Sequence, residues 1–213
     1  VAVNPDGSVD ASFATGTGFD ATVTWIEGAR DGSTDIYAVG DFANYDGLGQ
    51  VRLIKLRADG SRDASLAVGA GADNALLTLA LAEDGSGDIY IGGAQANYDG
   101  NPVSFLNRVN ADGSFDTSYA TDGCDNTVNS IIPISDGSND IYTGGGFATC
   151  RGGGTLAGLG RFDPNSQVDT GFANAGFDGL VNQVRPHPGG DGDVLVTGGF
   201  TMYGATTTTG FDS

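Results

Sequence analysis

The stretch Asp112-Gly113-Ser114-Phe115-Asp116 decides the fold, because similar stretches occur at a regular interval along the chain. The equivalent stretches begin at Asp6, Asp59 and Asn165, and each ends in an aspartate. These closing aspartates are 53 residues apart, at Asp10, Asp63, Asp116 and Asp169. Self-similarity at a fixed period predicts a repeat architecture in which each copy is one structural unit.

Two further sets of residues follow the same interval. A glycine closes each apolar segment that begins Asp-Ile-Tyr or its equivalent Asp-Val-Leu, and these glycines are Gly40, Gly93, Gly145 and Gly198. An aspartate opens each preceding apolar run, at Asp20, Asp73, Asp125 and Asp178, with one residue lost before Asp125. We therefore expect a single repeat domain over 1–213, with copies at approximately 1–53, 54–106, 107–159 and 160–213 whose boundaries cut through a strand.

Each copy is expected to contain four β-strands. The run 74–81 is short, apolar and followed by the turn residues Asp84-Gly85-Ser86, which favours a buried strand over a helix. Asp-Gly-Ser between two apolar runs is typical of a hairpin, because glycine adopts a positive φ and aspartate hydrogen-bonds within its own turn. The following strands of this unit are predicted at 88–93, 103–109 and 115–119, all antiparallel.

Four antiparallel strands repeated at this interval predict the blades of a β-propeller, in which neighbouring blades cover each other's faces. A β-helix needs a shorter period, and a helical solenoid needs helical periodicity. The expected fold class is all-β, a β-propeller built from four ~53-residue four-stranded antiparallel blades. Two arrangements stay open: the blades close into a ring, with 1–4 sharing a blade with 208–213, or they belong to a larger array.

The segment around each Asp-Gly-Ser turn resembles the delta-60 repeat family of bacterial β-propeller repeats, whose pattern is Arg-Leu-Asn-Pro-Asp-Gly-Ser-Leu-Asp. The matching segments are 55–63, 108–116 and a more divergent 161–169, whereas the first copy has Ala2 in place of the cation. The resemblance covers nearly the whole chain. It implies a propeller architecture and occurrence in large surface proteins, and it says little about function.

Charge and composition exclude several classes of function. With 27 acidic against 9 basic residues, the net charge of -18 repels polyphosphates, so no nucleic-acid partner is expected. No apolar stretch is long enough to span a membrane, so no membrane insertion is expected. A single lysine, Lys55, and a single histidine, His187, leave little material for acid–base or nucleophilic catalysis, and we expect no enzyme.

The repeated turn aspartates raise the question of calcium, because Ca²⁺ binds several oxygen ligands at once. Neither an EF-hand loop nor the glycine-rich calcium-binding repeat occurs in the chain. Structural turn chemistry is therefore the favoured interpretation, and bound Ca²⁺ is the alternative. The candidate ligands would be Asp6, Asp10, Asp59, Asp63, Asp112 and Asp116.

Two other sets of side chains recur in register. Lys55, Arg108 and Arg161 each lie near a repeated aspartate, and we expect a buried or half-buried ion pair inside each unit. A tyrosine recurs in the loop after the second strand, at Tyr45, Tyr98 and Tyr203. Such rings either stack on sugars, as amphipathic rings do in binding sites, or anchor the loop on the neighbouring blade. Anchoring is the favoured interpretation.

The chain has two cysteines, and both replace aromatic residues of the repeat. Cys124 stands at the position of Phe19 and Phe177, and Cys150 stands at the tyrosine position of the same copy. Because both changes fall in one copy, we expect a disulfide between Cys124 and Cys150. A disulfide favours a secreted or cell-surface location.

These observations predict a non-enzymatic extracellular or cell-surface structural or adhesive repeat protein, either a subunit of a surface filament or a domain of a large adhesin. Its partners would be further copies of itself or other surface proteins, since open strand edges can pair between chains. The alternative is a carbohydrate-binding, lectin-like propeller with glycans as partners and repeated sites. A glycosidase is disfavoured, because the acids repeat at turns instead of pairing across a cleft.

Overall fold

The structure is a computed structural model that describes residues 1–119, 122–152, 154–172, 174–189 and 192–207. Every regular element in these ranges is a β-strand, and all strand pairs are antiparallel. The prediction of an all-β, antiparallel fold is confirmed.

Three three-stranded sheets and one two-stranded sheet follow one another along the chain. The first sheet consists of β1 (Val23–Gly28), β2 (Ile36–Gly40) and β5 (Leu53–Leu56). The second consists of β6 (Leu76–Leu81), β7 (Ile89–Gly93) and β10 (Leu106–Val109). The third consists of β11 (Val128–Pro133), β12 (Ile141–Gly145) and β13 (Leu159–Phe162). The fourth pairs β14 (Leu180–Pro186) with β15 (Val194–Gly199).

A small hairpin follows the second strand of three of these sheets. The hairpins are β3 (Asn44–Tyr45) with β4 (Leu48–Gly49), β8 (Asn97–Tyr98) with β9 (Asn101–Pro102), and β16 (Met202–Tyr203) with β17 (Thr206–Thr207). The sequence indicated only a loop at this place. Each hairpin pairs its tyrosine across a tight turn, so the tyrosine side chain is held at a fixed position.

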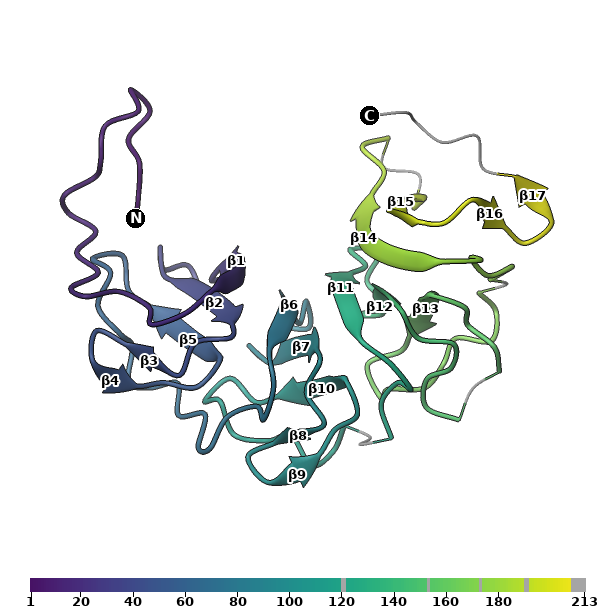
Figure 1. Cartoon of the computed structure of the whole chain (residues 1–213), viewed down its shortest axis with the longest axis horizontal. Helices are drawn as coiled ribbons and strands as arrows, with labels where there is room; N and C mark the ends of the chain where they lie inside the picture. Colours follow the sequence, from purple (N-terminus) through teal and green to yellow (C-terminus); the bar gives the residue numbers. More distant parts are fainter. Residues whose placement is uncertain (120–121, 153, 173, 190–191, 208–213) are drawn as a thin grey trace.

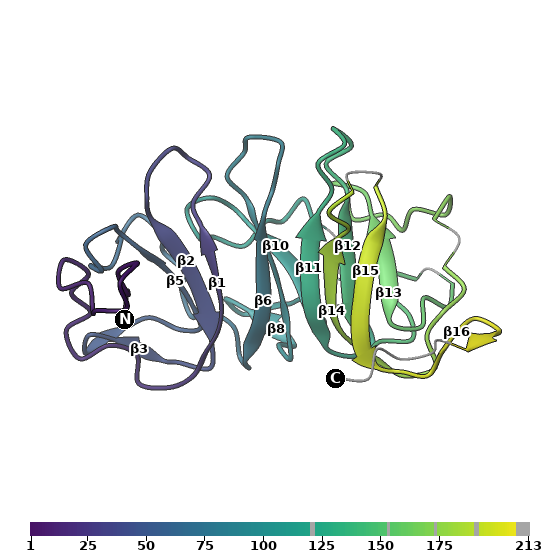
Figure 2. The same cartoon turned by 90° about the horizontal axis from the view of Figure 1, so that it is seen from above.

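The four sheets stand side by side around an open arc (Figure 1). Their first strands contact one another in order, β1 with β6, β6 with β11 and β11 with β14. Viewed from above, these strands line up along the inner side of the arc (Figure 2). The first and fourth sheets lie at opposite ends of the arc, and a gap separates them in Figure 1. Of the expected pairing of 1–4 with 208–213, the segment 208–213 lies outside the described residues.

The recurrent glycine at the end of each second strand has a steric cause. A Cβ at Gly40 would overlap the carbonyl oxygen of Thr22, and a Cβ at Gly145 would overlap that of Thr127. The first strand comes this close because each one carries a register shift near its start, as between Val23 and Trp25. A β-bulge of this kind bends and twists the strand, and glycine accommodates the close backbone approach.

The predicted fourth strand of each unit is reduced to a single bridging pair, which corrects the four-stranded expectation. Val109 pairs with Phe115 only, and Leu56 pairs with Arg62 only. The reason lies in the following residues: the backbone amide of Ser118 donates to Asp116 at 2.8 Å, and its hydroxyl donates to the same oxygen. This local turn directs the chain away from the sheet immediately after the bridge.

The hydrophobic core lies between neighbouring sheets. One cluster joins Tyr37, Val39 and Leu53 of the first sheet to Leu79 and Ile91 of the second. Similar clusters join the second sheet to the third and the third to the fourth. Burying each large apolar side chain stabilises the fold by roughly 1.5–3 kcal/mol. The apolar side chains of a sheet are therefore fully buried only where a neighbouring sheet covers each of its faces.

Candidate functional site

The recurring cations lie in carboxylate clusters between the hairpin turn and the end of the third strand. Lys55 Nζ lies 2.7 Å from Asp31 and 3.6 Å from Asp35. Arg108 Nε lies 2.6 Å from a carboxylate oxygen of Asp116. Burial alone would raise the pKa of Asp116, but hydrogen bonds from Ser118 and Arg108 outweigh it and hold the pKa below its ordinary value. The expected half-buried ion pairs are present.

Each cation of this set also lies over a tyrosine ring of the second strand. The pairs are Lys55 over Tyr37 at 5.5 Å, Arg108 over Tyr90 at 5.9 Å and Arg161 over Tyr142 at 5.9 Å from the ring centre. Arg161 lies 2.8 Å from Asp140 and 3.2 Å from Asp169. The cation, ring and carboxylates form one structural contact repeated in three sheets.

The candidate calcium ligands take part in turns. The amide and hydroxyl of Ser114 donate to one oxygen of Asp112 at 2.9 and 2.6 Å, and these two bonds lower the pKa of Asp112. The same bonds recur from Ser8 to Asp6 and from Ser61 to Asp59. The other candidates accept from Ser12, Ser65 and Ser118, at Asp10, Asp63 and Asp116. Among the described residues, no group of three acidic, histidine or cysteine side chains could hold a metal ion.

Two of the recurring tyrosines, Tyr45 and Tyr98, are buried loop anchors. Tyr45 and Tyr98 are fully buried, and the hydroxyl of Tyr98 donates to the carbonyl of Gly113 at 2.7 Å. Tyr203 is half-buried and lies 4.7 Å from Phe177, ring centre to ring centre. No ring face of Tyr45 or Tyr98 is open to a sugar, so sugar stacking at these two positions is not supported.

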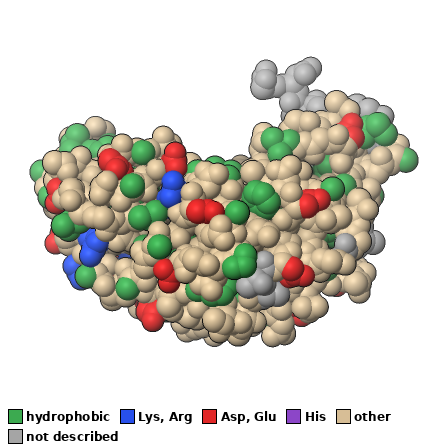
Figure 3. Space-filling view, turned by 60° about the horizontal axis from the view of Figure 1, so that its bottom comes forward, with side chains coloured by type: hydrophobic (Ala, Val, Ile, Leu, Met, Phe, Trp, Pro, Cys, Tyr) green, Lys and Arg blue, Asp and Glu red, His purple; other side chains and the backbone are tan. Residues whose placement is uncertain are grey.

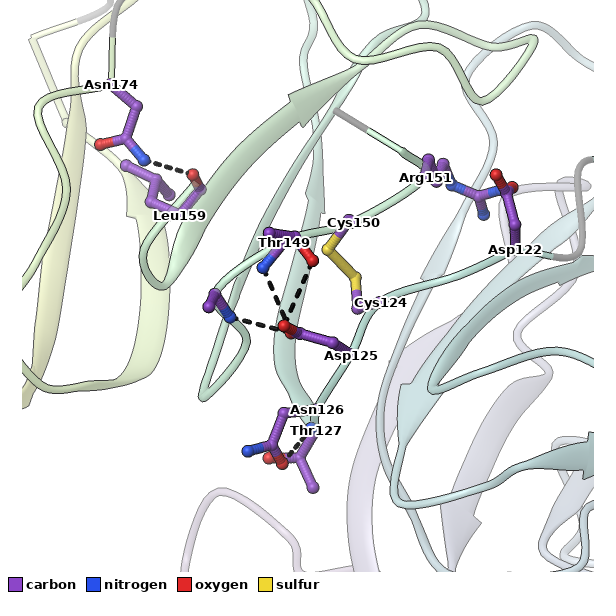
Figure 4. The surroundings of a disulfide bond; sticks show 11 residues. Asp122, Cys124, Asp125, Asn126, Thr127, Thr149, Cys150, Arg151, Leu159 and Asn174 are labelled. Carbon is purple, nitrogen blue, oxygen red and sulfur yellow. Dashed lines mark hydrogen bonds and ion pairs between the residues drawn. A yellow bond between two sulfur atoms is a disulfide. The ribbon is translucent and has the colours of Figure 1, made fainter. Parts of the chain in front are cut away.

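A disulfide joins Cys124 to Cys150 in the third unit (Figure 4). The two cysteines form a bridging pair at the position where Phe19 faces Tyr45 and Phe177 faces Tyr203. The covalent bond thus replaces an aromatic contact of the repeat. Next to it, Asp125 accepts from the amides of Ala148 and Thr149 at 2.9 and 3.2 Å, which fixes the loop to the first strand.

A polar cavity of about 180 Å³ is lined by residues of all four first strands and of the turns that follow them. The guanidinium of Arg185 lies 4.5 Å from the centre of the Trp25 ring, so β14 reaches β1 beside this cavity. Arg30 lies 2.5 Å from Glu83, and Ser135 donates to the same carboxylate oxygen at 3.0 Å. Residues at equivalent positions of three successive units therefore meet at one edge of the cavity.

The two end faces of the arc expose apolar side chains that the inner units bury. Ile26 on β1 is 63% exposed, whereas its equivalents Leu79, Ile131 and Val184 are buried. Leu195 on β15 is 50% exposed, whereas its equivalents Tyr37, Tyr90 and Tyr142 are buried. Ile26 lies on the face of the first sheet that, in the inner units, packs against the preceding sheet. Leu195 lies on the face of the fourth sheet that, in the inner units, packs against the following sheet. Each end of the arc therefore exposes an apolar surface that, inside the arc, forms the interface between two sheets.

A groove of about 690 Å³ runs along β15 and is also lined by Tyr142 and Leu159 of the third sheet. In the other sheets the second strand pairs on both sides, but within the described residues β15 pairs only with β14. The groove is lined mainly by apolar side chains, among them Phe172, Phe177, Val194, Val196 and Phe200. An apolar groove beside an open strand edge can accept an added β-strand.

The surface of the molecule is acidic. Figure 3 shows acidic side chains spread over one face, whereas most of the basic ones visible there lie toward one end. This distribution agrees with a net charge of -18. Within the described residues, no helix is long and apolar enough to cross a membrane.

Antiparallel sheets that stand around an arc and cover one another define a β-propeller-type repeat protein. The segments 30–66 and 85–119 match a family described as a β-propeller domain of unknown function (DUF5122). Each matched segment runs from a hairpin turn through the second and third strands to just beyond the bridging pair. The match supports a propeller-type repeat family in general terms. A search of the curated proteins found no match.

The end faces and the cavity were not indicated by the sequence. Ile26 occupies the same register position as Leu79, so its exposure could not be read from residue type. One signal was available: Leu195 and Ala2 are the two positions where the tyrosine and the cation of the repeat are lost.

Proposed function

We propose that this chain is a non-enzymatic structural or adhesive module of an extracellular or cell-surface protein, and that its function depends on assembly through the ends of the arc. The observation that carries the proposal is the exposure of Ile26 and Leu195 on opposite end faces, at positions the inner units bury. Exposed apolar faces of this kind mark interaction sites. The recurring charged groups are engaged in turns and ion pairs within the chain, which accords with a structural role.

The location outside the cytoplasm is supported by the bond between Cys124 and Cys150, since disulfides persist in oxidising compartments. The acidic surface keeps such a module soluble. We further propose that the repeats are of the delta-60 type and that the four units act as propeller blades. The recurrent cation and Asp-Gly-Ser turn, as at 108–116, support this assignment.

The test is the location and assembly state of the native protein. Antibodies against the chain are applied to intact cells in immunogold electron microscopy, with an antibody against a cytoplasmic protein as the permeability control. Label on the cell surface or on surface filaments is the expected result. Label that appears only after permeabilisation would contradict the proposal.

A carbohydrate-binding function is the second candidate, and the polar cavity lined by the four first strands favours it. The cavity joins the indole of Trp25 to the carboxylates of Glu27 and Glu83 and the guanidinium of Arg185. Sugar sites combine an aromatic ring with a few polar groups in this way. The indole Nε1 of Trp25 is buried and has no hydrogen-bond partner among the described residues.

A glycan array separates this candidate from the first. Wild-type chain is compared with Trp25→Ala and with Leu48→Ala, which changes an exposed side chain on the β3–β4 hairpin away from the cavity. Binding that is lost in Trp25→Ala and kept in Leu48→Ala would support a lectin. Absence of binding by the wild-type chain would reject it.

A further inference from the structure

We propose that the groove along β15 binds the N-terminal segment Val1–Val3 of a second copy of this chain, so that the arcs associate head to tail. The inference rests on the proposed function and names the partner of the end faces. Within the described residues, the edge of β15 that faces away from β14 has no strand paired to it, so it can supply backbone hydrogen-bonding groups to a strand of the second copy.

The register of the repeat specifies the pairing. In the first sheet, β2 pairs with β5 through Ile36 with Leu56, Tyr37 with Lys55, and Ala38 with Ile54. The repeat spacing places Val194, Leu195 and Val196 at the β2 positions. It places Val3, Ala2 and Val1 at the corresponding β5 positions. The docked strand would therefore form three wholly apolar cross-strand pairs: Val194 with Val3, Leu195 with Ala2, and Val196 with Val1.

Both members of the central pair, Leu195 and Ala2, differ from the residues at the equivalent positions of the other units. Elsewhere this pair is a tyrosine facing a cation, as in Tyr37 with Lys55 and Tyr90 with Arg108. At Leu195 the tyrosine is lost, and at Ala2 the cation is lost. Loss of one member alone would leave a cation without its ring or a ring without its cation. The matched change to Leu and Ala indicates that these two residues face each other.

A second contact of the repeat also suits the docked arrangement. After the bridging pair, the chain places an aromatic ring on the tyrosine of the sheet it has just left: Tyr119 lies 5.6 Å from Tyr90, and Phe172 lies 5.3 Å from Tyr142, between ring centres. The equivalent residue near the N-terminus is Phe13. In the proposed complex, Phe13 of the second copy would cover the exposed face of Leu195, and the Ile26 face would meet the fourth sheet.

The N-terminal segment is available for this contact. Val1 is 86% exposed and Val3 is 60% exposed, whereas the equivalents Ile54 and Leu56 are buried in the first sheet. Val3 already pairs with Val9, so the segment is held as the start of a small β-structure. Within one chain the segment lies at the opposite end of the arc from β15 (Figure 1). A second copy can bring the two together.

The contact is heterologous, because it joins two different surfaces of the same chain. Repetition of such a contact gives a closed ring if the rotation closes and a filament if it does not. Both products use one interface. They differ only in the angle between successive arcs.

The test is sedimentation velocity and multi-angle light scattering of the purified full chain over a wide concentration range, with Val3→Asp and Leu195→Asp as variants. A charge placed in the apolar groove is expected to weaken association at least about 100-fold. Both positions are exposed in the arc, so circular dichroism and the unfolding midpoint should stay close to wild type. The matched control is Leu48→Asp, since Leu48 is 54% exposed but lies on neither end face, and it should associate like wild type.

Mixing the two variants gives a sharper result. Each variant keeps one intact end, so an equimolar mixture should form heterodimers although neither variant associates alone. A wild-type chain that stays monomeric, or association that Val3→Asp and Leu195→Asp leave unchanged, would overturn the inference. Association that both variants leave unchanged overturns only this docking, because assembly through another contact remains. A wild-type chain that stays monomeric overturns the assembly in the proposed function as well, so the two failures are distinguishable.

Discussion

Arg185 on β14 places its guanidinium 4.5 Å from the centre of the Trp25 ring on β1, so the first and fourth sheets touch beside the polar cavity. The extensive contacts between first strands join neighbours in the chain, β1 with β6, β6 with β11 and β11 with β14. The contact of Arg185 with Trp25 spans the whole arc and limits how far its two ends can separate. The relative position of the end faces therefore depends in part on one cation and one aromatic ring.

We predict that Arg185→Ala lowers the free energy of unfolding by about 0.5–1 kcal/mol, the usual contribution of a cation–π pair at a partly exposed site. Trp25 is the single tryptophan of the chain, so its fluorescence emission should change in this variant. The control is Arg57→Ala. Arg57 directly follows the third strand, β5, and its guanidinium lies 3.0 Å from the carboxylate of Asp63. Emission that changes equally in both variants, or in neither, would contradict the contact.

A second prediction concerns the disulfide. Cys124 and Cys150 are 26 residues apart, and in the chain-entropy account a bond closing such a loop stabilises the fold by about 3–4 kcal/mol. We expect the variant with Cys124→Ser and Cys150→Ser to lose most of this stabilisation, as measured by urea unfolding. The variant with Cys124→Phe and Cys150→Tyr should recover part of the loss, because it restores the aromatic pair of Phe19 and Tyr45. Equal stability of the two double variants would show that the aromatic pair contributes nothing.

Much of the fold could be predicted from the sequence, because its main signals have local causes. Gly40 and its equivalents are required where the first strand comes close, so they recur at every second strand. Asp112 and Ser114 form their turn from side chains two residues apart. Such features depend on a few neighbouring residues and are therefore visible as a pattern.

The arc and its ends could not be predicted in the same way. Whether sheets close into a ring depends on the angle between them, and contacts between distant residues such as Trp25 and Arg185 contribute to that angle. The tyrosines illustrate a related difficulty: Tyr98 is an amphipathic residue in a loop, but its ring is buried and its hydroxyl is bonded to Gly113. Residue type alone does not distinguish an anchor of this kind from a binding residue.

A third prediction concerns acid. Hydrogen bonds from Ser114 lower the pKa of Asp112, and bonds from Ser8 and Ser61 do the same for Asp6 and Asp59. A carboxylate whose folded-state pKa is depressed contributes stability above its ordinary pKa of about 3.9, and this contribution is lost as the pH falls through the folded-state pKa. We therefore expect the free energy of unfolding to fall below about pH 4.

Urea unfolding at pH 7, 5 and 3 measures this dependence. Asp88 acts in the opposite sense, because burial raises its pKa despite the neighbouring Arg108. Repulsion within a chain of net charge -18 would also favour the folded state as carboxylates become neutral. A stability that rises steadily from pH 7 to pH 3 would mean that repulsion outweighs the turn hydrogen bonds.

The last prediction separates the proposed apolar junction from an association based on ion pairs. Two copies that each carry a net charge of -18 repel each other, and raising the salt from 0.01 to 0.15 M shortens the screening length from about 30 to about 8 Å. The pairs expected at the junction, Val3 with Val194 and Ala2 with Leu195, have no charge for salt to weaken. Association measured by sedimentation should therefore strengthen with salt, on the order of tenfold over this range, and sodium sulfate should strengthen it further because excluded salts favour apolar burial. If salt instead dissociates the complex, ion pairs dominate the contact, and the docking of Val1–Val3 beside β15 is wrong.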